Sequence, residues 1–307
     1  DINLENLIVT NNSAQIGGGI YVYEAPSGVT IDNSVIINNN LDDGGGEGGG
    51  GIAIKNSIAS ISNSLIENNE DAGIYLTQGS DQIQNVISNS VIIGNEQGII
   101  SSWNDAKIEN SSIIYNKSLG LNCSNGDRTV INSIIYGNGE IYGSPNIELF
   151  ANDTESGILA ISYSDIEGGQ DSVNVQTGTL NWGDGNIDVD PMFADTANGD
   201  FSLLADSPLI DAGHPDSTDA DGTRADIGAY YYDQSGQPAR VQGFVTTPGV
   251  DNIALVWTAN DQATNYNLYR STEAATDFYT ATPLTTLNAT TYTDSTVAAH
   301  TTYHYRV

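Results

Sequence analysis

The first half of the chain repeats one arrangement of apolar and polar positions around an asparagine. We anchor each copy on an Asn that precedes a Ser, and the clear anchors are Asn33, Asn63, Asn89, Asn110 and Asn132. An aliphatic residue lies two positions before each anchor, and a second lies three positions after it. Another Asn follows the anchor by six positions, and a Gly-aliphatic pair such as Gly98-Ile99 comes after a variable gap. The chain therefore consists of similar short units over this half.

This repeat predicts an all-β fold, with a right-handed parallel β-helix over residues 1–182. Units of roughly 21 to 31 residues are stacked structures that bury a shared face. The two aliphatic columns are an odd number of positions apart, so one strand must end and another begin at the anchor between them. Asn tolerates the left-handed turn conformation, and stacked amides can bond from rung to rung. About seven rungs at ~4.8 Å each give roughly 30 Å of solenoid.

The repeat ends near Gly183, and a different set of motifs follows. They are Asp190-Pro191-Met192-Phe193, Ser207-Pro208-Leu209-Ile210-Asp211-Ala212-Gly213 and the run from Asp219 to Tyr230. These motifs resemble the C-terminal end of secreted bacterial right-handed parallel β-helix repeat proteins. The resemblance implies that residues 183–234 close and cap the solenoid, with Phe193, Phe201 and Leu209 covering its apolar end. Many of those proteins read Tyr-Glu-Tyr where this chain has Tyr231 in the middle, so the resemblance does not extend to any site that depends on this Glu.

The last part of the chain has the pattern of a small β-sandwich. Residues 235–240 read as a linker, because Ser, Gly and Pro are concentrated there. Residues 241–307 then alternate in short strands and resemble a fibronectin type III domain, with Trp257 as its core tryptophan and Tyr303 as its corner tyrosine. The sequence stops at the sixth expected strand, so this domain is incomplete. The resemblance implies further domains of the same polypeptide beyond it.

Charge narrows the range of partners. The 307 residues include 8 Lys and Arg against 39 Asp and Glu, for a formal net charge of -31. Such a surface repels nucleic acid and anionic membranes. No apolar run approaches the ~20 residues that a membrane span needs. The single Cys123 excludes an internal disulfide. The acidic, Asn-rich and Lys-poor composition suits an extracellular or bacterial cell-surface location.

The sequence gives weak signals for catalysis. No His lies in the solenoid, which leaves a Ser-His-Asp arrangement there unsupported. Many right-handed β-helices are polysaccharide lyases or glycosidases, and such lyases use a Lys or Arg as the base. Lys107 and Arg128 are therefore the weak catalytic candidates, with Asp105 and Glu109 nearby on adjacent rungs. The alternative is that these are isolated solvated charges on a strand face.

The closing run also suggests a metal site. Asp219, Asp221 and Asp226 have the alternating spacing of carboxylates that suits a Ca²⁺ loop, although the distal Glu of an EF-hand is missing. Calcium is thus the candidate cofactor. The alternative is a loop in which these side chains bond to backbone amides and Arg224 pairs with one of them.

Three aromatic residues are candidates for stacking on sugars: Tyr21, Tyr75 and Trp103. The alternative for each is ordinary strand composition. Together these observations favour an adhesion or glycan-binding module of the cell surface, with a polysaccharide or surface glycan as partner and no catalytic role. A second interpretation is a polysaccharide lyase or glycoside hydrolase that acts on a cell-wall or algal polysaccharide. A third is a structural component of a surface layer or filament.

Overall fold

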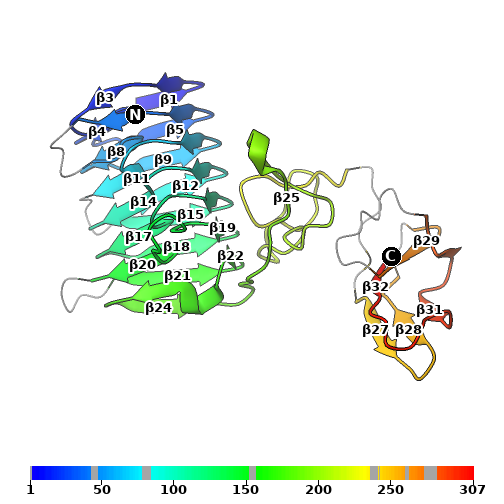
Figure 1. The fold of residues 1–307 in the computed structure, drawn as a ribbon. Coiled ribbons are helices and arrows are strands. Elements are labelled where there is room, and N and C mark those ends of the chain that lie inside the picture. The colour runs from blue at the N-terminus through cyan, green and yellow to red at the C-terminus, as the bar shows by residue number, and fades with distance from the viewer. Residues whose placement is uncertain are drawn as a thin grey trace. The chain divides into compact units, whose positions relative to one another are not determined.

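A computed structural model describes residues 2–42, 48–77, 84–151, 157–235, 241, 243–259, 263–272 and 282–307. The chain forms two compact units, residues Asp1–Asp233 and Gln234–Val307. Figure 1 shows the first unit as a stack of strands. Two short 3₁₀ helices, η1 (Gly169–Ser172) and η2 (Thr196–Asn198), are the helical elements of the described residues. Apart from Ser235, the predicted linker at 235–240 lies outside the described residues.

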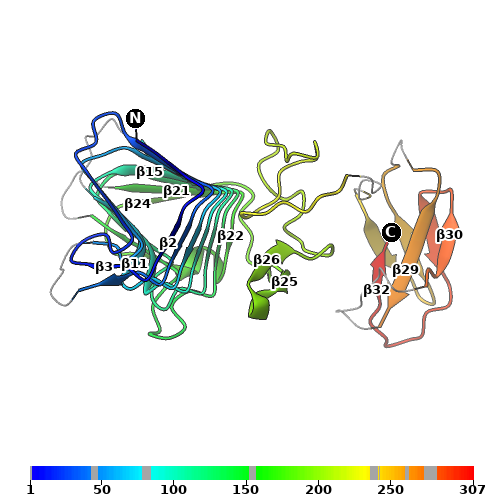
Figure 2. The ribbon, with the colours of Figure 1, turned by 90° about the horizontal axis from the view of Figure 1, so that it is seen from above.

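Three parallel sheets form the solenoid, which confirms the predicted parallel β-helix (Figures 1 and 2). Sheet 1 contains β1 (Ile2–Glu5), β5 (Val29–Asp32), β9 (Ala59–Ser62), β12 (Gln84–Ser88), β15 (Asp105–Glu109), β18 (Arg128–Ile131), β21 (Ile158–Ser162) and β24 (Thr179–Trp182). Sheet 2 contains β2 (Ile8–Thr10), β6 (Val35–Ile37), β10 (Leu65–Glu67), β13 (Val91–Ile93), β16 (Ser112–Ile114), β19 (Ile134–Tyr136) and β22 (Asp165–Ile166). Sheet 3 contains β4 (Ile20–Tyr23), β8 (Ile52–Lys55), β11 (Ala72–Thr77), β14 (Gln97–Ser102), β17 (Leu121–Ser124), β20 (Ile147–Phe150) and β23 (Val173–Val175). A short pair, β3 (Ser13–Ala14) and β7 (Asn40–Leu41), lies beside them.

The two aliphatic columns face the interior, as the repeat predicts. Neighbouring rungs pair in register, so that Ile87 lies opposite Ile108 in sheet 1 and Ile92 opposite Ile113 in sheet 2. All four side chains are fully buried in one continuous core. Stacking like residues from rung to rung buries their apolar surface against each other, and this burial is the main stabilising contribution of the solenoid.

The Asn residues six positions after each anchor form a buried ladder. The Asn95 amide donates to Asn116 Oδ1 at 3.1 Å and accepts from Asn69 Nδ2 at 3.0 Å. Its Oδ1 also accepts the backbone N–H of Asn69, and its Nδ2 donates to the carbonyl of Ile66. The ladder explains the Gly of the Gly-aliphatic pair: a Cβ on Gly98 would come within 2.4 Å of Gly120 O and 3.0 Å of Asn116 Nδ2.

The anchor asparagines form the corner between sheets 1 and 2, which we call the asparagine corner. Its members have left-handed backbone angles, with φ of 46° at Asn33 and 49° at Asn89. This confirms the predicted turn, since Asn adopts the left-handed region more readily than most residues. The serine that follows each anchor completes the corner. Ser64 Oγ, for example, donates to Ser62 O and accepts the N–H of Ser34.

Residues 183–233 form the flanking segment. Its start continues the last rung of the solenoid, where Ile187 pairs in parallel with Asp165 of β22. The rest packs on the outer face of sheet 2 rather than over the end of the solenoid. The segment includes β25 (Phe193–Asp195) and β26 (Asp200–Leu203). In Figure 2 these two strands lie next to sheet 2, whose first and last strands are labelled β2 and β22. Its buried apolar residues form a second core with outward-facing residues of sheet 2; this core contains Val91, Ile93, Ile114, Ile134, Phe201, Leu203, Leu209, Ile210 and Ile227. Phe201 and Leu209 belong to this second core and Phe193 packs against it, so the predicted role of these residues as a cap over the solenoid end is wrong. An outer sheet face with aliphatic residues must be covered, and the flanking segment covers it.

The second unit contains two three-stranded antiparallel sheets. Their orders are β27-β28-β31 and β30-β29-β32, formed by β27 (Val245–Pro248), β28 (Ile253–Val256), β29 (Tyr266–Ser271), β30 (Thr285–Leu287), β31 (Thr291–Asp294) and β32 (His304–Arg306). Trp257 is buried in their core with Leu255 and Leu268. Asp294 is also buried, and it accepts hydrogen bonds from Arg270 and Tyr305. Burial acts to raise the pKa of Asp294, but its hydrogen bonds hold that pKa at about 2.

Candidate functional site

The structure does not bring the two catalytic candidates together. Lys107 faces outward from β15 and forms an ion pair with Glu109 at 2.6 Å. Arg128 pairs in register with the buried Ala106, points into the solenoid and is 1% exposed. The two side chains therefore lie on opposite faces of sheet 1.

Arg128 has a complete set of internal partners. Its five N–H groups donate to Ser101 Oγ and O, Asn125 O, Gly126 O and Ser124 O, at 2.5 to 3.1 Å. Arg has five donors in total, so none remains for a ligand. Burial lowers the pKa of Arg128. The Arg128 side chain thus fills the interior beside the turn between sheets 3 and 1 and stabilises that turn through its hydrogen bonds.

The three aspartates proposed as calcium ligands bond to the polypeptide itself. Asp219 Oδ2 accepts the N–H of Asp226 at 2.8 Å, and Asp221 Oδ1 accepts the N–H of Thr223 at 3.0 Å. The Asp226 carboxylate accepts the N–H groups of Asp211 and Tyr232, both at 2.7 Å. This is the arrangement of an amide-bonded loop. Within the described residues, no group of three or more His, Cys, Asp or Glu side chains is placed to hold a metal ion.

The described hydrogen bonds of Arg224 go to backbone carbonyls, whereas the amide-bonded alternative expected an aspartate as its partner. Its Nε donates to Gly213 O at 2.7 Å, and its NH2 group donates to Ala212 O at 3.4 Å. These are backbone carbonyls of the same closing run rather than a carboxylate. Arg224 thus ties two parts of the closing run together through backbone carbonyls.

Two of the three aromatic candidates for sugar stacking lie on the outer face of sheet 3. Tyr21 and Tyr75 both pair in register with Ala53, one on either side of it. The exposed Tyr21 also stacks on Tyr23, with ring centroids 6.1 Å apart. Trp103 is exposed at a turn after β14, with a left-handed φ of 55°. The structure thus places Tyr21 and Tyr75 on one surface and Trp103 at its edge.

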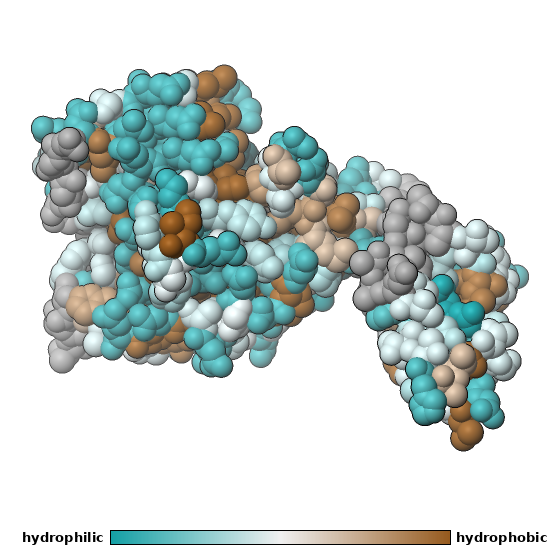
Figure 3. Space-filling model, viewed as in Figure 1, coloured by the Kyte–Doolittle hydropathy of each residue, from teal (hydrophilic) through white to brown (hydrophobic). Residues whose placement is uncertain are grey.

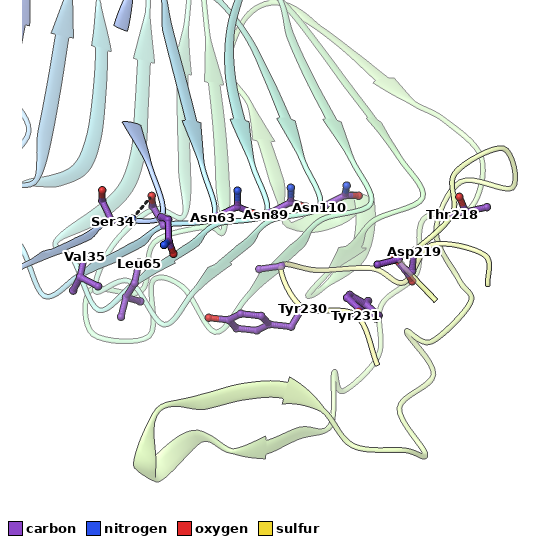
Figure 4. Close-up of a pocket in the computed structure, with 14 residues that line it drawn as sticks. Ser34, Val35, Asn63, Leu65, Asn89, Asn110, Thr218, Asp219, Tyr230 and Tyr231 are labelled. Atoms are coloured by element: carbon purple, nitrogen blue, oxygen red, sulfur yellow. Dashed lines mark hydrogen bonds between the residues drawn. The ribbon is translucent and has the colours of Figure 1, made fainter. Parts of the chain in front are cut away.

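A groove of about 800 Å³ lies between the asparagine corner and the flanking segment (Figure 4). From the solenoid it is lined by Asn33, Ser34, Val35, Asn63, Ser64, Leu65, Asn89 and Asn110, and from the flanking segment by Thr218, Asp219, Ala220, Ala229, Tyr230 and Tyr231. In Figure 4 the side chains of Asn63, Asn89 and Asn110 form a row and point to the same side. The row runs from rung to rung, so the groove follows the axis of the solenoid.

The two tyrosines of the groove are accessible. Tyr230 is 46% exposed and Tyr231 is 44% exposed. Both belong to the flanking segment, across from the asparagine row in Figure 4. The groove therefore presents aromatic rings from the flanking segment on one side and the asparagine row of the solenoid on the other, and the amides in Figure 4 point away from the rings.

The groove carries little charge for a protein this acidic. Asp219 is the single charged residue among the described residues that line it. Burial raises the pKa of Asp219 to about 6. A carboxylate pair for glycosidase chemistry needs two acids about 5–9.5 Å apart, and the lining supplies one. The groove is suited to an uncharged ligand.

Two more aspartates, Asp226 within the flanking segment and Asp165 of β22 in the solenoid, have raised pKa values. Burial raises the pKa of Asp226 to about 7, although two backbone N–H groups bond to it. Burial likewise raises the pKa of Asp165 to about 7, and the charges of Asp188 and Glu167 add to the shift. Asp165 Oδ1 accepts the N–H of Val189 at 3.1 Å, which ties β22 to the flanking segment.

These shifts predict that the first unit becomes less stable as the pH rises. An unfolded Asp has a pKa of about 3.9, so the folded state binds protons more tightly than the unfolded state does. The stabilisation is complete below the unfolded value and is lost as the pH rises through the folded values, between about 4 and 7. We expect the free energy of unfolding to fall across this range in urea titrations. In Asp165→Asn the decrease in the free energy of unfolding between pH 4 and 7 should be smaller by ~1–3 kcal/mol. A wild-type protein that gains stability across this range would contradict the raised pKa values.

The sequence did not single out the residues of the groove. The anchor asparagines were recognised as turn residues, but their side-chain direction depends on the corner geometry. Tyr230 and Tyr231 were seen as part of a closing motif. The available signal was the run of three tyrosines, Tyr230 to Tyr232, because three successive large side chains cannot all point into one core.

Comparison with known families agrees with the solenoid geometry. Residues 1–138 match the family model described as "Right handed beta helix region". The matched part of the solenoid is thus a right-handed β-helix. A comparison with curated proteins finds no match. No helix among the described residues is long and apolar enough to cross a membrane.

Proposed function

We propose that this protein is a non-catalytic glycan-binding module of an extracellular or bacterial cell-surface protein, used for adhesion. The observation that carries the proposal is the groove, which combines a row of amides from three rungs with two accessible tyrosines. Sugars present both hydroxyl groups and apolar C–H faces, so a site of amides and aromatic rings matches both. The repeat supports a long ligand, because each rung adds an equivalent side chain along the groove.

The second unit supports a surface role. We propose that residues 241–307 form a fibronectin type III-like domain that acts as a spacer. Two antiparallel sheets, the buried Trp257 and the bond from the Ala298 N–H to the Tyr303 hydroxyl at 3.0 Å are consistent with this assignment. Further domains of the same polypeptide are part of this proposal.

The flank of the solenoid favours binding over catalysis. The catalytic candidates of the sequence are separated, with Arg128 buried and Lys107 paired with Glu109. A general base must reach the proton that it removes, and the buried guanidinium has all its donors engaged within the turn. The groove lining has Asp219 as its one charged residue among the described residues. It therefore favours neutral polysaccharides over polyuronates, which the net charge of -31 repels.

Affinity electrophoresis of the full chain through gels containing neutral and acidic polysaccharides tests this function. We expect retardation by a neutral polysaccharide and no product release from it. Tyr230→Ala should weaken the retardation about tenfold, since an aromatic contact and its buried area together contribute ~1–2 kcal/mol. Tyr21→Ala, on the outer face of sheet 3, is the control for a site outside the groove and should change little.

The same panel separates the other interpretations. Release of unsaturated products or reducing ends, lost in Lys107→Ala, would support a lyase or hydrolase. Retardation abolished by Tyr21→Ala and unchanged in Tyr230→Ala would move the binding site to sheet 3. Absence of retardation by every polysaccharide would favour a structural role in a surface layer or filament.

A further inference from the structure

The flanking segment begins as one more rung of sheet 2. Ile187 pairs in parallel with Asp165 of β22. Ile187 donates its N–H to Ser164 O at 2.9 Å, and its carbonyl accepts the N–H of Ile166 at 3.0 Å. We call residues 186–189 the junction, because they connect the end of sheet 2 to the rest of the flanking segment.

Asp165 occupies an apolar position beside the junction. The outward column of sheet 2 that ends at Asp165 carries Leu65, Val91 and Ile134 at the same register on other rungs. Its paired neighbours, Ile134 on one side and Ile187 on the other, both take part in the second core. In the space-filling view of Figure 3, hydrophobic residues gather along the border between the solenoid and the flanking segment. The Asp165 carboxyl group therefore lies where the fold otherwise places apolar side chains.

One carboxyl oxygen of Asp165 has neither a protein partner nor access to water. Oδ1 accepts the N–H of Val189 at 3.1 Å. Oδ2 is buried and has no hydrogen-bond partner among the described residues, and the residue as a whole is 0% exposed. An ionised carboxylate in such a place is far less favourable than the neutral acid. Because no larger ligand can reach this oxygen, a proton is the ligand that fits it.

The groups that face Asp165 also oppose its ionisation. Burial is the main cause that raises the pKa of Asp165 to about 7, and the charges of Asp188, Glu167 and Asp190 add to the shift. Glu167 comes from the end of β22, and the other two acids come from the junction and the residues after it. Tyr136 of β19 is the remaining titratable neighbour, and its own pKa is raised, so it stays uncharged at neutral pH.

We infer that Asp165 is a pH sensor that controls the pairing of the junction with β22. The junction stays paired while Asp165 is protonated, and it separates from β22 when Asp165 ionises, because separation admits water to the carboxylate. The rest of the flanking segment stays attached through its apolar residues in the second core. Local opening is sufficient, since few hydrogen bonds hold this last rung.

The sign of the pH dependence follows from the two states of Asp165. In the open junction the carboxyl group is hydrated, with a pKa near the ordinary value of about 3.9. The paired state therefore binds the proton more tightly than the open state does. Pairing is strongest below about pH 4, weakens by up to tenfold per pH unit as the pH rises to about 7, and then becomes constant.

Amide hydrogen exchange of the full chain, followed by NMR between pH 5 and 8, tests the inference. After correction for the intrinsic exchange rate, we expect the protection of the Ile187 and Val189 amides to fall at least about thirtyfold between pH 5 and 7 and to change little above pH 8. The Val91 amide, which donates to Ser64 O in the middle of sheet 2, reports the opening of the solenoid itself. Its protection should stay at least tenfold higher than that of the junction amides throughout.

Matched variants identify the sensor. Asp165→Asn keeps an acceptor for Val189 but cannot ionise, so the fall in junction protection should shrink to less than threefold. Asp184→Asn is the control, because Asp184 is an exposed acid just before the junction and is not among the charges that act on Asp165. It should show the wild-type fall.

A third variant keeps the test decisive if Asp165→Asn does not fold. Asp188→Asn retains an acceptor for the Gly168 N–H and removes one like charge from Asp165. Its junction protection should fall as in the wild type but become constant at a lower pH.

Three results would overturn the inference. The first is junction protection that stays constant between pH 5 and 7. The second is a fall that persists in Asp165→Asn or an unchanged profile in Asp188→Asn, because the sensor would then lie elsewhere. The third is equal protection of the junction amides and Val91, because the junction would then open only with the solenoid. None of these results depends on a glycan ligand, so the proposed function is tested separately.

Discussion

Replacing Arg128 with alanine is expected to lower the free energy of unfolding of the first unit by ~3–5 kcal/mol. The substitution removes five hydrogen bonds to Ser101, Ser124, Asn125 and Gly126 and leaves buried carbonyl groups without donors. It also opens a cavity in a turn where the side chain is 1% exposed. Removal of the desolvated charge offsets part of this loss, so the estimate stays below the sum of the individual bonds. Urea titration followed by far-UV circular dichroism measures the change.

Two further variants separate structure from charge at this position. Arg128→Lys keeps a positive charge but has only three donors. We therefore expect its loss in free energy of unfolding to be more than half of the loss in Arg128→Ala. Lys107→Ala removes an outward ion pair from the same sheet and should cost less than ~1 kcal/mol. Equal effects of Arg128→Ala and Lys107→Ala would show that the buried hydrogen bonds of Arg128 contribute little.

Asn95→Ala should destabilise the solenoid by ~3–4 kcal/mol. Four hydrogen bonds to Asn69, Ile66 and Asn116 are lost together, and their partners remain in a dry interior. Each unpaired buried group costs about 1–3 kcal/mol, with partial relief where the rungs relax. The midpoint of urea unfolding reports the effect.

The asparagine corner provides the control for this ladder. Asn89 is exposed and has a φ of 49°, so Asn89→Gly retains the backbone conformation without disturbing a buried network. We expect a change within about 1 kcal/mol. If Asn95→Ala were as mild as Asn89→Gly, the buried amide ladder would have no special energetic role, and the aliphatic columns alone would set the stability.

The rungs were predictable because every copy repeats the same local contacts. Parity within a strand also determines which way a side chain points. Arg128 lies two positions before the inward Val130, so it shares that inward face, whereas Lys107 lies one position before the inward Ile108 and faces outward. Applied to both residues, this rule separates them without coordinates. The sequence interpretation grouped the two as catalytic candidates on adjacent rungs without comparing the strand faces on which they lie.

The placement of the flanking segment could not be predicted in this way. It has no repeat, and its contacts join residues far apart in the chain: His214 lies 82 positions from Asn132, and Ala229 lies 117 positions from Ser112. The apolar residues Phe201 and Leu209 were recognised as core material, but the sequence does not specify which surface they cover. The groove exists only after this docking, because one of its sides comes from each partner.

The docking of residues 183–233 has a consequence for how the solenoid opens under load. A rung in a solenoid contacts only its two neighbours, so local separation can spread along the stack one rung at a time. The flanking segment contacts Val91, Ile114 and Ile134 on successive strands of sheet 2. These shared contacts couple the three rungs, so we expect them to unfold together. Ile8, on the same face, is 76% exposed and is not covered by the flanking segment. For a module that holds a ligand under tension, we expect the rungs in contact with the flanking segment to unfold last.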